Sequence, residues 1–171
     1  MERREFHLNN RFFDYCFDGR VEEMKEALEA GADPNFTTGH YRYLSALMEA
    51  THWGNYEAVD LLLAQPGINV NHQCSWGWTA LHYACERDWV AILKRLLQAP
   101  GILVNEKGHL GYTPIMAAAR KGFTEAVRLL AAVEEVDLDA KDNQGNGADL
   151  MLMGMKMASR PATLFNRVGP W

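Results

Sequence analysis

The stretch Gly77-Trp78-Thr79-Ala80-Leu81-His82-Tyr83-Ala84-Cys85 returns 34 residues later, with substitutions, as Gly111-Tyr112-Thr113-Pro114-Ile115-Met116-Ala117-Ala118-Ala119. A weaker copy, Ser45-Ala46-Leu47-Met48-Glu49-Ala50-Thr51, lies 34 residues before the first. Leucines keep the same step along the whole chain, at Leu28, Leu62, Leu96, Leu130 and Leu164. Self-similarity at a period of roughly 20 to 50 residues indicates a repeat architecture. The period therefore decides the fold before any local secondary structure is considered.

The segment Thr-Ala-Leu-His-Tyr-Ala that starts at Thr79 resembles the Thr-Pro-Leu-His-x-Ala signature of the ankyrin repeat, a turn followed by two helices. The copy that starts at Thr113 departs from it where Met116 replaces the His. The resemblance implies an all-α solenoid of five helix-turn-helix repeats with projecting turns. We place the repeats at about residues 8–39, 40–73, 74–107, 108–141 and 142–171 of a single domain, 1–171.

The first and last repeats are expected to be caps with a polar outer face. In the first, residues 12–19 would form one helix and its turn and residues 21–30 the other helix, with Met24, Ala27 and Leu28 on its apolar side. In the last, Pro161 is well placed to open a short helix over residues 162–168. Four methionines lie just before it and would either close the stack or form a partner surface: Met151, Met153, Met155 and Met157.

Composition places the chain among ordinary globular proteins: 171 residues, 48% hydrophobic, with a formal net charge of −5. No apolar run approaches the roughly 20 residues of a membrane span, and no secretory signal precedes the repeats. Three irregularly spaced cysteines predict reduced thiols rather than a disulfide framework. We therefore expect a cytoplasmic or nuclear protein without a membrane segment.

Charge is unevenly distributed. Residues 1–75 hold 6 basic and 12 acidic side chains, whereas residues 76–128 hold 7 basic and 4 acidic ones. The acidic first part argues against general binding of a nucleic-acid backbone. The locally basic stretch could instead steer an acidic protein partner.

The sequence contains only weak signals for a catalytic or metal-binding site. His72, Cys74, His82 and Cys85 have a zinc-like spacing, but His82 is the signature histidine and the four need not converge. The turn at residues 144–147 is glycine-rich, yet no Lys-Ser/Thr follows it. No hydrolase, metalloprotease or kinase motif is present. The sequence predicts neither an enzyme nor a bound cofactor or metal.

The resemblance implies that partners bind the concave side, made of the turn tips and the exposed ends of the first helices. Aromatic and basic residues, the types enriched in binding hot spots, fall at these positions. The predicted partner-binding residues are Tyr41, Arg42, Trp53, Trp76, Trp78, Arg87, Tyr112, Arg120 and Lys121. In the alternative interpretation, Trp76 and Trp78 pack turn against turn, and the basic residues form an ordinary solvated face.

The function that follows is a protein-interaction module: a monomeric adaptor, scaffold or inhibitor that binds an acidic partner with apolar anchors. The alternative is a substrate-recognition subunit of a larger enzyme, such as a ubiquitin ligase, although no ligase-docking box follows residue 158.

Asn71 and Asn105 lie in a context similar to that of hydroxylated ankyrin asparagines. Such asparagines also shape their own turns, so both readings stay open.

Overall fold

The computed structural model describes residues 2–39 and 42–148, and these residues form paired helices without a β-strand. The pairs are α1 (Glu2–Asp18) with α2 (Val21–Glu29), α3 (Ala46–Trp53) with α4 (Tyr56–Leu63), α5 (Ala80–Glu86) with α6 (Val90–Leu97), and α7 (Pro114–Lys121) with α8 (Thr124–Ala131). This order confirms the predicted all-α stack of helical hairpins. No helix in the described part of the chain is long and apolar enough to cross a membrane.

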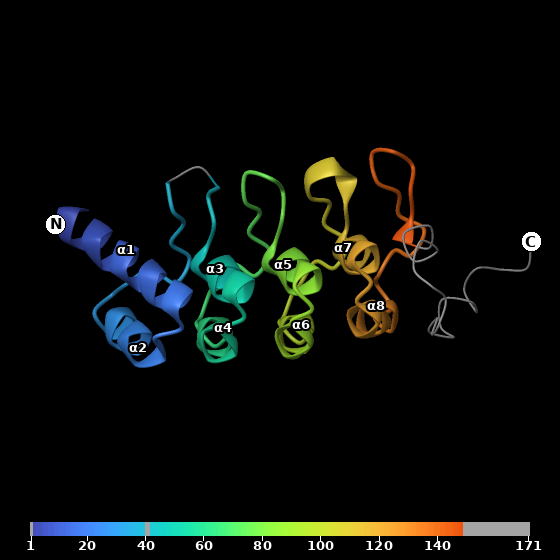
Figure 1. Ribbon diagram of the computed structural model, residues 1–171. Helices are drawn as coiled ribbons and strands as arrows, with labels where there is room; N and C mark the ends of the chain where they lie inside the picture. Colours follow the sequence, from blue (N-terminus) through green and yellow to red (C-terminus); the bar gives the residue numbers. More distant parts are fainter. Residues whose placement is uncertain (1, 40–41, 149–171) are drawn as a thin grey trace, which may run out of the picture.

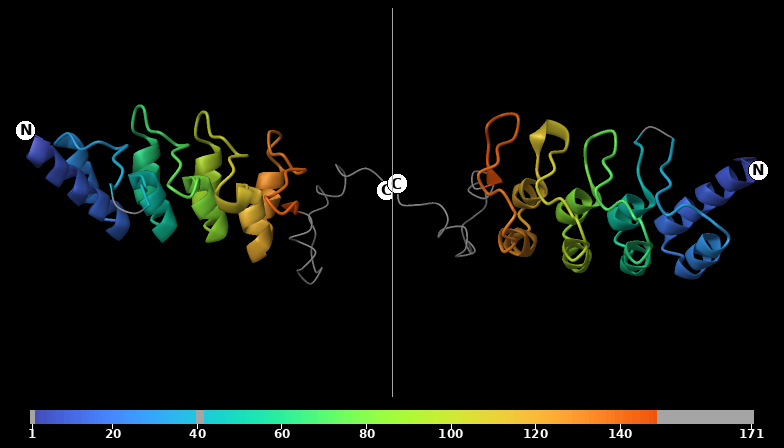
Figure 2. Two further views of the ribbon diagram at one scale, coloured as in Figure 1. Left: turned by 90° about the horizontal axis from the view of Figure 1, so that it is seen from above. Right: turned by 180° about the vertical axis from the view of Figure 1, so that it is seen from behind.

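The helix pairs lie side by side along one axis, with α1 and α2 at one end (Figure 1). Helices α3, α5 and α7 form one row, and α4, α6 and α8 form a second row beneath it (Figure 1). The views from above and from behind show the same succession, and each pair packs against the next (Figure 2). Each hairpin thus buries its apolar face against its neighbours, which a hairpin alone cannot do.

The loops between pairs project beyond the row of α3, α5 and α7, and we call them fingers (Figure 1). In the second finger, the backbone N–H of Cys74 donates to the carbonyl of Trp78 at 3.0 Å and closes the turn. Equivalent bonds close the third finger, which contains the short helix η1 (His109–Gly111), and the fourth. The turns thus occupy residues 74–78, 108–112 and 142–146, and an isolated bridge between Thr37 and Ser45 braces the first finger.

Neighbouring repeats are also joined by a row of asparagines below the fingers. The side-chain carbonyl of Asn71 accepts from the backbone N–H of Leu103 at 2.8 Å, and its amide donates to the carbonyl of Gly101 at 2.7 Å. Asn35 and Asn105 make the same two bonds to the loops that follow them. Each asparagine satisfies two backbone groups of the next repeat, which fixes the spacing between loops.

The first helix differs from the prediction. The sequence pattern placed this helix and its turn at residues 12–19, but α1 begins at Glu2. Leu8, Phe12 and Cys16 continue one inward-facing stripe at helical spacing, and Phe12 and Cys16 are fully buried. The side chain of Asn9 also accepts from the backbone N–H of Asp33 at 2.8 Å. The extra turns are held by these contacts, which lie outside the repeat signature.

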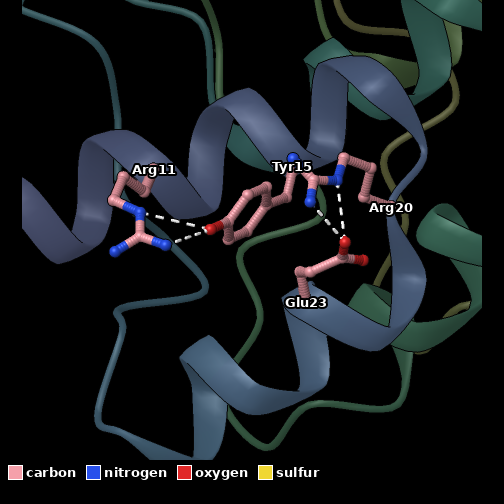
Figure 3. Close-up of polar contacts among 4 residues, drawn as sticks. All are labelled: Arg11, Tyr15, Arg20 and Glu23. Atoms are coloured by element: carbon pink, nitrogen blue, oxygen red, sulfur yellow. Dashed lines mark hydrogen bonds and ion pairs between the residues drawn. The ribbon is translucent and has the colours of Figure 1, made fainter.

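The outer face of this first repeat carries an aromatic and polar cluster (Figure 3). The Tyr15 hydroxyl accepts from Nη2 of Arg11 at 2.6 Å, and the Arg20 guanidinium lies over the Tyr15 ring at 4.9 Å. Arg20 also forms an ion pair with Glu23 of α2. The cluster covers the end of the stack with polar groups, as expected for a cap. The last repeat and its methionines, from residue 149 onward, lie outside the described residues.

Candidate protein-interaction face

The ends of the first helices and the finger tips carry a set of side chains that we call the finger-side face. Within the described residues it comprises Arg42, Trp53, Trp76, Trp78, Arg87, Tyr112, Arg120 and Lys121. Trp53, Arg87 and Lys121 recur at steps of 34, at the carboxyl ends of α3, α5 and α7. The repeat therefore gives these three side chains the same place in successive hairpins. Tyr41 lies outside the described residues.

Trp53 is the last residue of α3, and its side chain remains 49% exposed. Its indole Nε1–H donates to Oε1 of Glu49, one turn earlier, at 3.0 Å. Phe17 of α1 meets the ring edge to face, with 4.7 Å between ring centroids. These contacts hold the indole in one orientation while half of its surface stays available to a partner.

Glu49 lies almost wholly buried beneath Trp53. Burial raises the pKa of its carboxyl group, while the Trp53 hydrogen bond and the positive charge of Arg42 act in the opposite direction. Glu49 was not among the site residues predicted from the sequence. The only sequence signal for it was its register in the repeat. Glu49 stands 34 residues before Tyr83, so the two residues occupy equivalent positions in α3 and α5.

Trp76 lies at the tip of the second finger and is 45% exposed. The guanidinium of Arg42, from the first finger, sits over the Trp76 ring, 4.8 Å from its centroid. The backbone joins the same two fingers, because the Ser75 N–H donates to the Arg42 carbonyl at 3.0 Å. A cation over an indole face is held in place without losing its charge.

Trp78 is placed differently from Trp76. Its ring stacks on His82, with 5.6 Å between centroids, and meets Tyr83 edge to face at 5.3 Å. The next finger closes over it at Gly108, where an added Cβ would lie 2.4 Å from the indole Cδ1. Trp78 thus packs finger against finger, and only part of its ring is exposed.

The cations of the face differ in their partners. Arg120 and Lys121 both lie 3.6 Å from Oε1 of Glu86, which belongs to the preceding repeat. The Arg120 guanidinium also lies 5.6 Å from the centroid of the half-buried Tyr112 ring. Arg87 instead donates from Nη2 to Nε2 of His52 at 3.0 Å, since a guanidinium cannot accept.

A chain of ring contacts links these residues across three repeats. His52 meets Trp53 at 5.3 Å and Tyr83 at 5.1 Å between centroids, and Tyr83 in turn meets Trp78. Phe17, His52 and Tyr83 were not among the predicted site residues. Phe17 meets Trp53, and His52 meets Tyr83, only through the packing of neighbouring repeats, which a sequence period does not reveal.

Asn71 and Asn105 are the predicted hydroxylation positions. Both side-chain amides make the two hydrogen bonds described above, which run to the loop of the following repeat rather than to their own turn. Their hydroxylation stays a prediction.

The four residues with a zinc-like spacing have other roles in the structure. Nδ1 of His82 accepts from the Thr79 N–H at 3.1 Å, and Nε2 of His82 lies 3.0 Å from the Tyr112 carbonyl. His72 bonds the backbone of the first finger, and Cys74 and Cys85 are buried free thiols. In the described part of the chain, no group of three or more His, Cys, Asp or Glu could hold a metal ion.

Comparison with known families agrees with this geometry. A model described as ankyrin repeats in three copies matches residues 13–108, and a single-repeat model matches residues 110–143. The chain belongs to the ankyrin repeat family. Ankyrin repeats are protein-interaction modules, and this is the class of protein to which the fold and family assign the chain.

Among curated proteins, the chain is similar to the RelA-associated inhibitor of Mus musculus. The two are 31% identical over 124 residues, which make up 71% of this chain and 15% of the relative. The chain thus spans a small part of that protein's length. The name of the relative describes a protein that associates with RelA and inhibits.

Proposed function

We propose that the chain binds a partner protein or peptide through the finger-side face and acts as an adaptor, scaffold or inhibitor. The observation that carries this proposal is the pair Trp53 and Trp76, each about half exposed, on consecutive repeats. Exposed apolar side chains that recur on one face mark interaction sites, and Trp is the residue type most enriched in hot spots. Arg42 lies over the Trp76 indole, and Arg87 bonds His52, the neighbour of Trp53; both would pair with acidic groups of the partner.

The other predicted anchors have smaller parts in this proposal. Trp78 supports the fingers from below, and Tyr112 supports the Arg120 guanidinium. Lys121 and Arg120 extend the positive charge toward the fourth repeat. The partner would therefore span at least the second to the fourth repeats, with its apolar contacts concentrated at the second and third.

The mouse relative suggests a first partner to test, because its name ties it to RelA and to inhibition. By analogy, we propose that this chain is a monomer that holds a regulatory protein in a complex. That complex would form in the cytoplasm or nucleus. A RelA-like protein is the first candidate partner to test. Capture from lysate tests for other partners without assuming their identity.

The test is binding by a Trp53→Ala/Trp76→Ala variant, compared with the wild type on immobilised RelA and in lysate. Leu103→Ala is the matched control, because Leu103 is an equally exposed apolar side chain (50%) on a loop between α6 and the third finger. We expect the double variant to lose about 2 kcal/mol or more of affinity for any specific partner.

Circular dichroism would first establish that all three proteins have the same helicity. If the double variant keeps full affinity, the finger-side face is not the binding site. The same conclusion follows if Leu103→Ala loses as much affinity as the double variant. In lysate, proteins captured by the wild type and Leu103→Ala but missing from the double variant are the partners that the proposal predicts.

A further inference from the structure

Two arginines of the finger-side face lack an acidic partner in residues 2–39 and 42–148. Arg42 and Arg87 take part in none of the ion pairs there, whereas Arg120 and Lys121 share Glu86. Arg42 lies over the Trp76 ring, and Arg87 gives one hydrogen bond to His52. Because a guanidinium carries five N–H donors, both groups keep donors free for a ligand.

Both of these arginines affect the pKa of the same side chain, the imidazole of His52. Partial burial lowers the pKa of His52, and the positive charges of Arg87 and Arg42 lower it further, against a smaller opposite effect of Glu86. Nε2 of His52 accepts from Arg87, so the neutral ring carries its proton on Nδ1, which is buried without a partner. Arg87 thus contacts the His52 ring directly, and Arg42 adds positive charge to the surroundings of that ring.

The acidic groups around His52 do not neutralise this cluster. Glu86 lies between Arg120 and Lys121, and Glu49 is buried with its Oε1 bonded to Trp53. The face thus holds more cationic than acidic side chains, although the whole chain has a net charge of −5. A local positive field on an acidic protein selects a partner with a localised negative charge rather than a long polyanion.

We infer that the partner places Asp or Glu side chains against Arg42 and Arg87, with an adjoining apolar residue on Trp53. This inference rests on the function proposed above, since it specifies the chemistry recognised by the same face. Arginine binds a carboxylate with two parallel hydrogen bonds, and a stacked guanidinium loses less freedom in doing so. Trp76 provides that stacking for Arg42, and His52 orients Arg87.

The probe is the blocked peptide Leu-Glu-Leu-Glu-Leu, and its twin with Gln in place of both Glu is the control ligand. Titrations of the ¹⁵N-labelled full chain would follow the arginine Nε–H signals and the His52 ring. We expect the Glu peptide to shift the signals of Arg42 and Arg87 and to bind roughly tenfold more tightly than the Gln peptide. Equal affinity of the two peptides, or shifts confined to other residues, would overturn the inference.

Two variants separate the candidate cations. Arg42→Gln/Arg87→Gln should abolish the preference for Glu over Gln, and Arg120→Gln/Lys121→Gln should keep most of it, because Glu86 already pairs with those two cations. The opposite pattern contradicts the assignment. All four side chains are exposed, so the variants should fold, and circular dichroism checks this. A phosphoserine peptide that binds at the same arginines more than about tenfold tighter than the Glu peptide would also contradict a carboxylate ligand.

A second readout is the pKa of His52, which should rise when the Glu peptide binds, since a nearby negative charge favours the imidazolium. The Gln peptide should leave it unchanged. Failure of this inference is distinguishable from failure of the proposed function. If Trp53→Ala/Trp76→Ala weakens partner binding but the arginine variants do not, only the acidic-ligand inference fails.

Discussion

The hydroxyl of Thr113 is buried without a hydrogen-bond partner because Met116 stands where His82 stands in the preceding repeat. In that repeat, the hydroxyl of Thr79 lies 3.0 Å from Nδ1 of His82, and the histidine reaches onward to the next finger. The fourth repeat therefore keeps the threonine of the repeat signature but lacks the group that satisfies it.

This difference predicts opposite effects of the same substitution. Thr113→Val replaces an unpaired buried hydroxyl with a methyl group and should raise the free energy of unfolding by about 1 kcal/mol. Thr79→Val removes a hydroxyl that has a partner and should lower it by about 1 kcal/mol. Urea denaturation of the two variants and the wild type measures both changes. If both variants shift in the same direction, the Thr113 hydroxyl is not the orphan that the geometry describes.

Acid should destabilise the protein through His82. Burial lowers the pKa of His82 to about 4, although its backbone hydrogen bonds act against this, and the unfolded chain has the ordinary value of 6.5. Because the folded pKa is depressed, the unfolded state binds the proton first. The stability associated with neutral His82 is complete above pH 6.5 and is lost as the pH falls toward 4.

Between about pH 7 and pH 5, this histidine alone should remove about 2 kcal/mol from the free energy of unfolding. The measurement is urea denaturation at both pH values, for the wild type and for His82→Gln, which cannot titrate. The variant should be less stable at neutral pH and less sensitive to acid. An equal loss in both proteins would assign the acid sensitivity to other groups.

Tyr43 occupies a backbone position that suits glycine. Its φ angle is 50°, and the residues at the same place in the next three fingers are Gly77, Gly111 and Gly145, all with positive φ. A non-glycine residue in the left-handed region costs about 1 kcal/mol or more. Tyr43→Gly should therefore raise the melting temperature.

Gly77→Ala is the control for this prediction and should lower the melting temperature. Its added Cβ would meet both the left-handed strain and the backbone of Gly108 at 3.2 Å. A Tyr43→Gly variant less stable than the wild type would mean that contacts of the tyrosine ring outweigh the strain in its backbone.

The asparagine row should be essential to the spacing of the repeats. Asn71→Ala removes two hydrogen bonds to the following loop and leaves the Leu103 N–H without its acceptor, so it should cost about 2 kcal/mol. Gln73→Ala, which removes one exposed side-chain bond to Glu106, is the control and should cost less than about 0.5 kcal/mol. Hydrogen exchange at the Leu103 amide gives a local readout, and unchanged protection there would refute the role of Asn71.

Sequence alone determined the repeat, its period of 34 and the all-α stack. Every hairpin must bury the same face against its neighbours, so Leu62, Leu96 and Leu130 recur at fully buried positions. The period did not predict the true start of α1, because the turns before Phe12 are held by contacts specific to the first repeat. A periodic pattern reports what the repeats share.

Only the tertiary structure decided how the candidate site is assembled. Trp76 and Trp78 are two residues apart and of one type, yet one lies under Arg42 at a finger tip and the other is covered at Gly108. Arg87 and Lys121 occupy equivalent positions, yet Lys121 forms an ion pair with Glu86, whereas Arg87 donates a hydrogen bond to His52. These differences arise from side-chain contacts between repeats about 34 residues apart, whose directions and distances depend on how the hairpins pack rather than on their order in the chain.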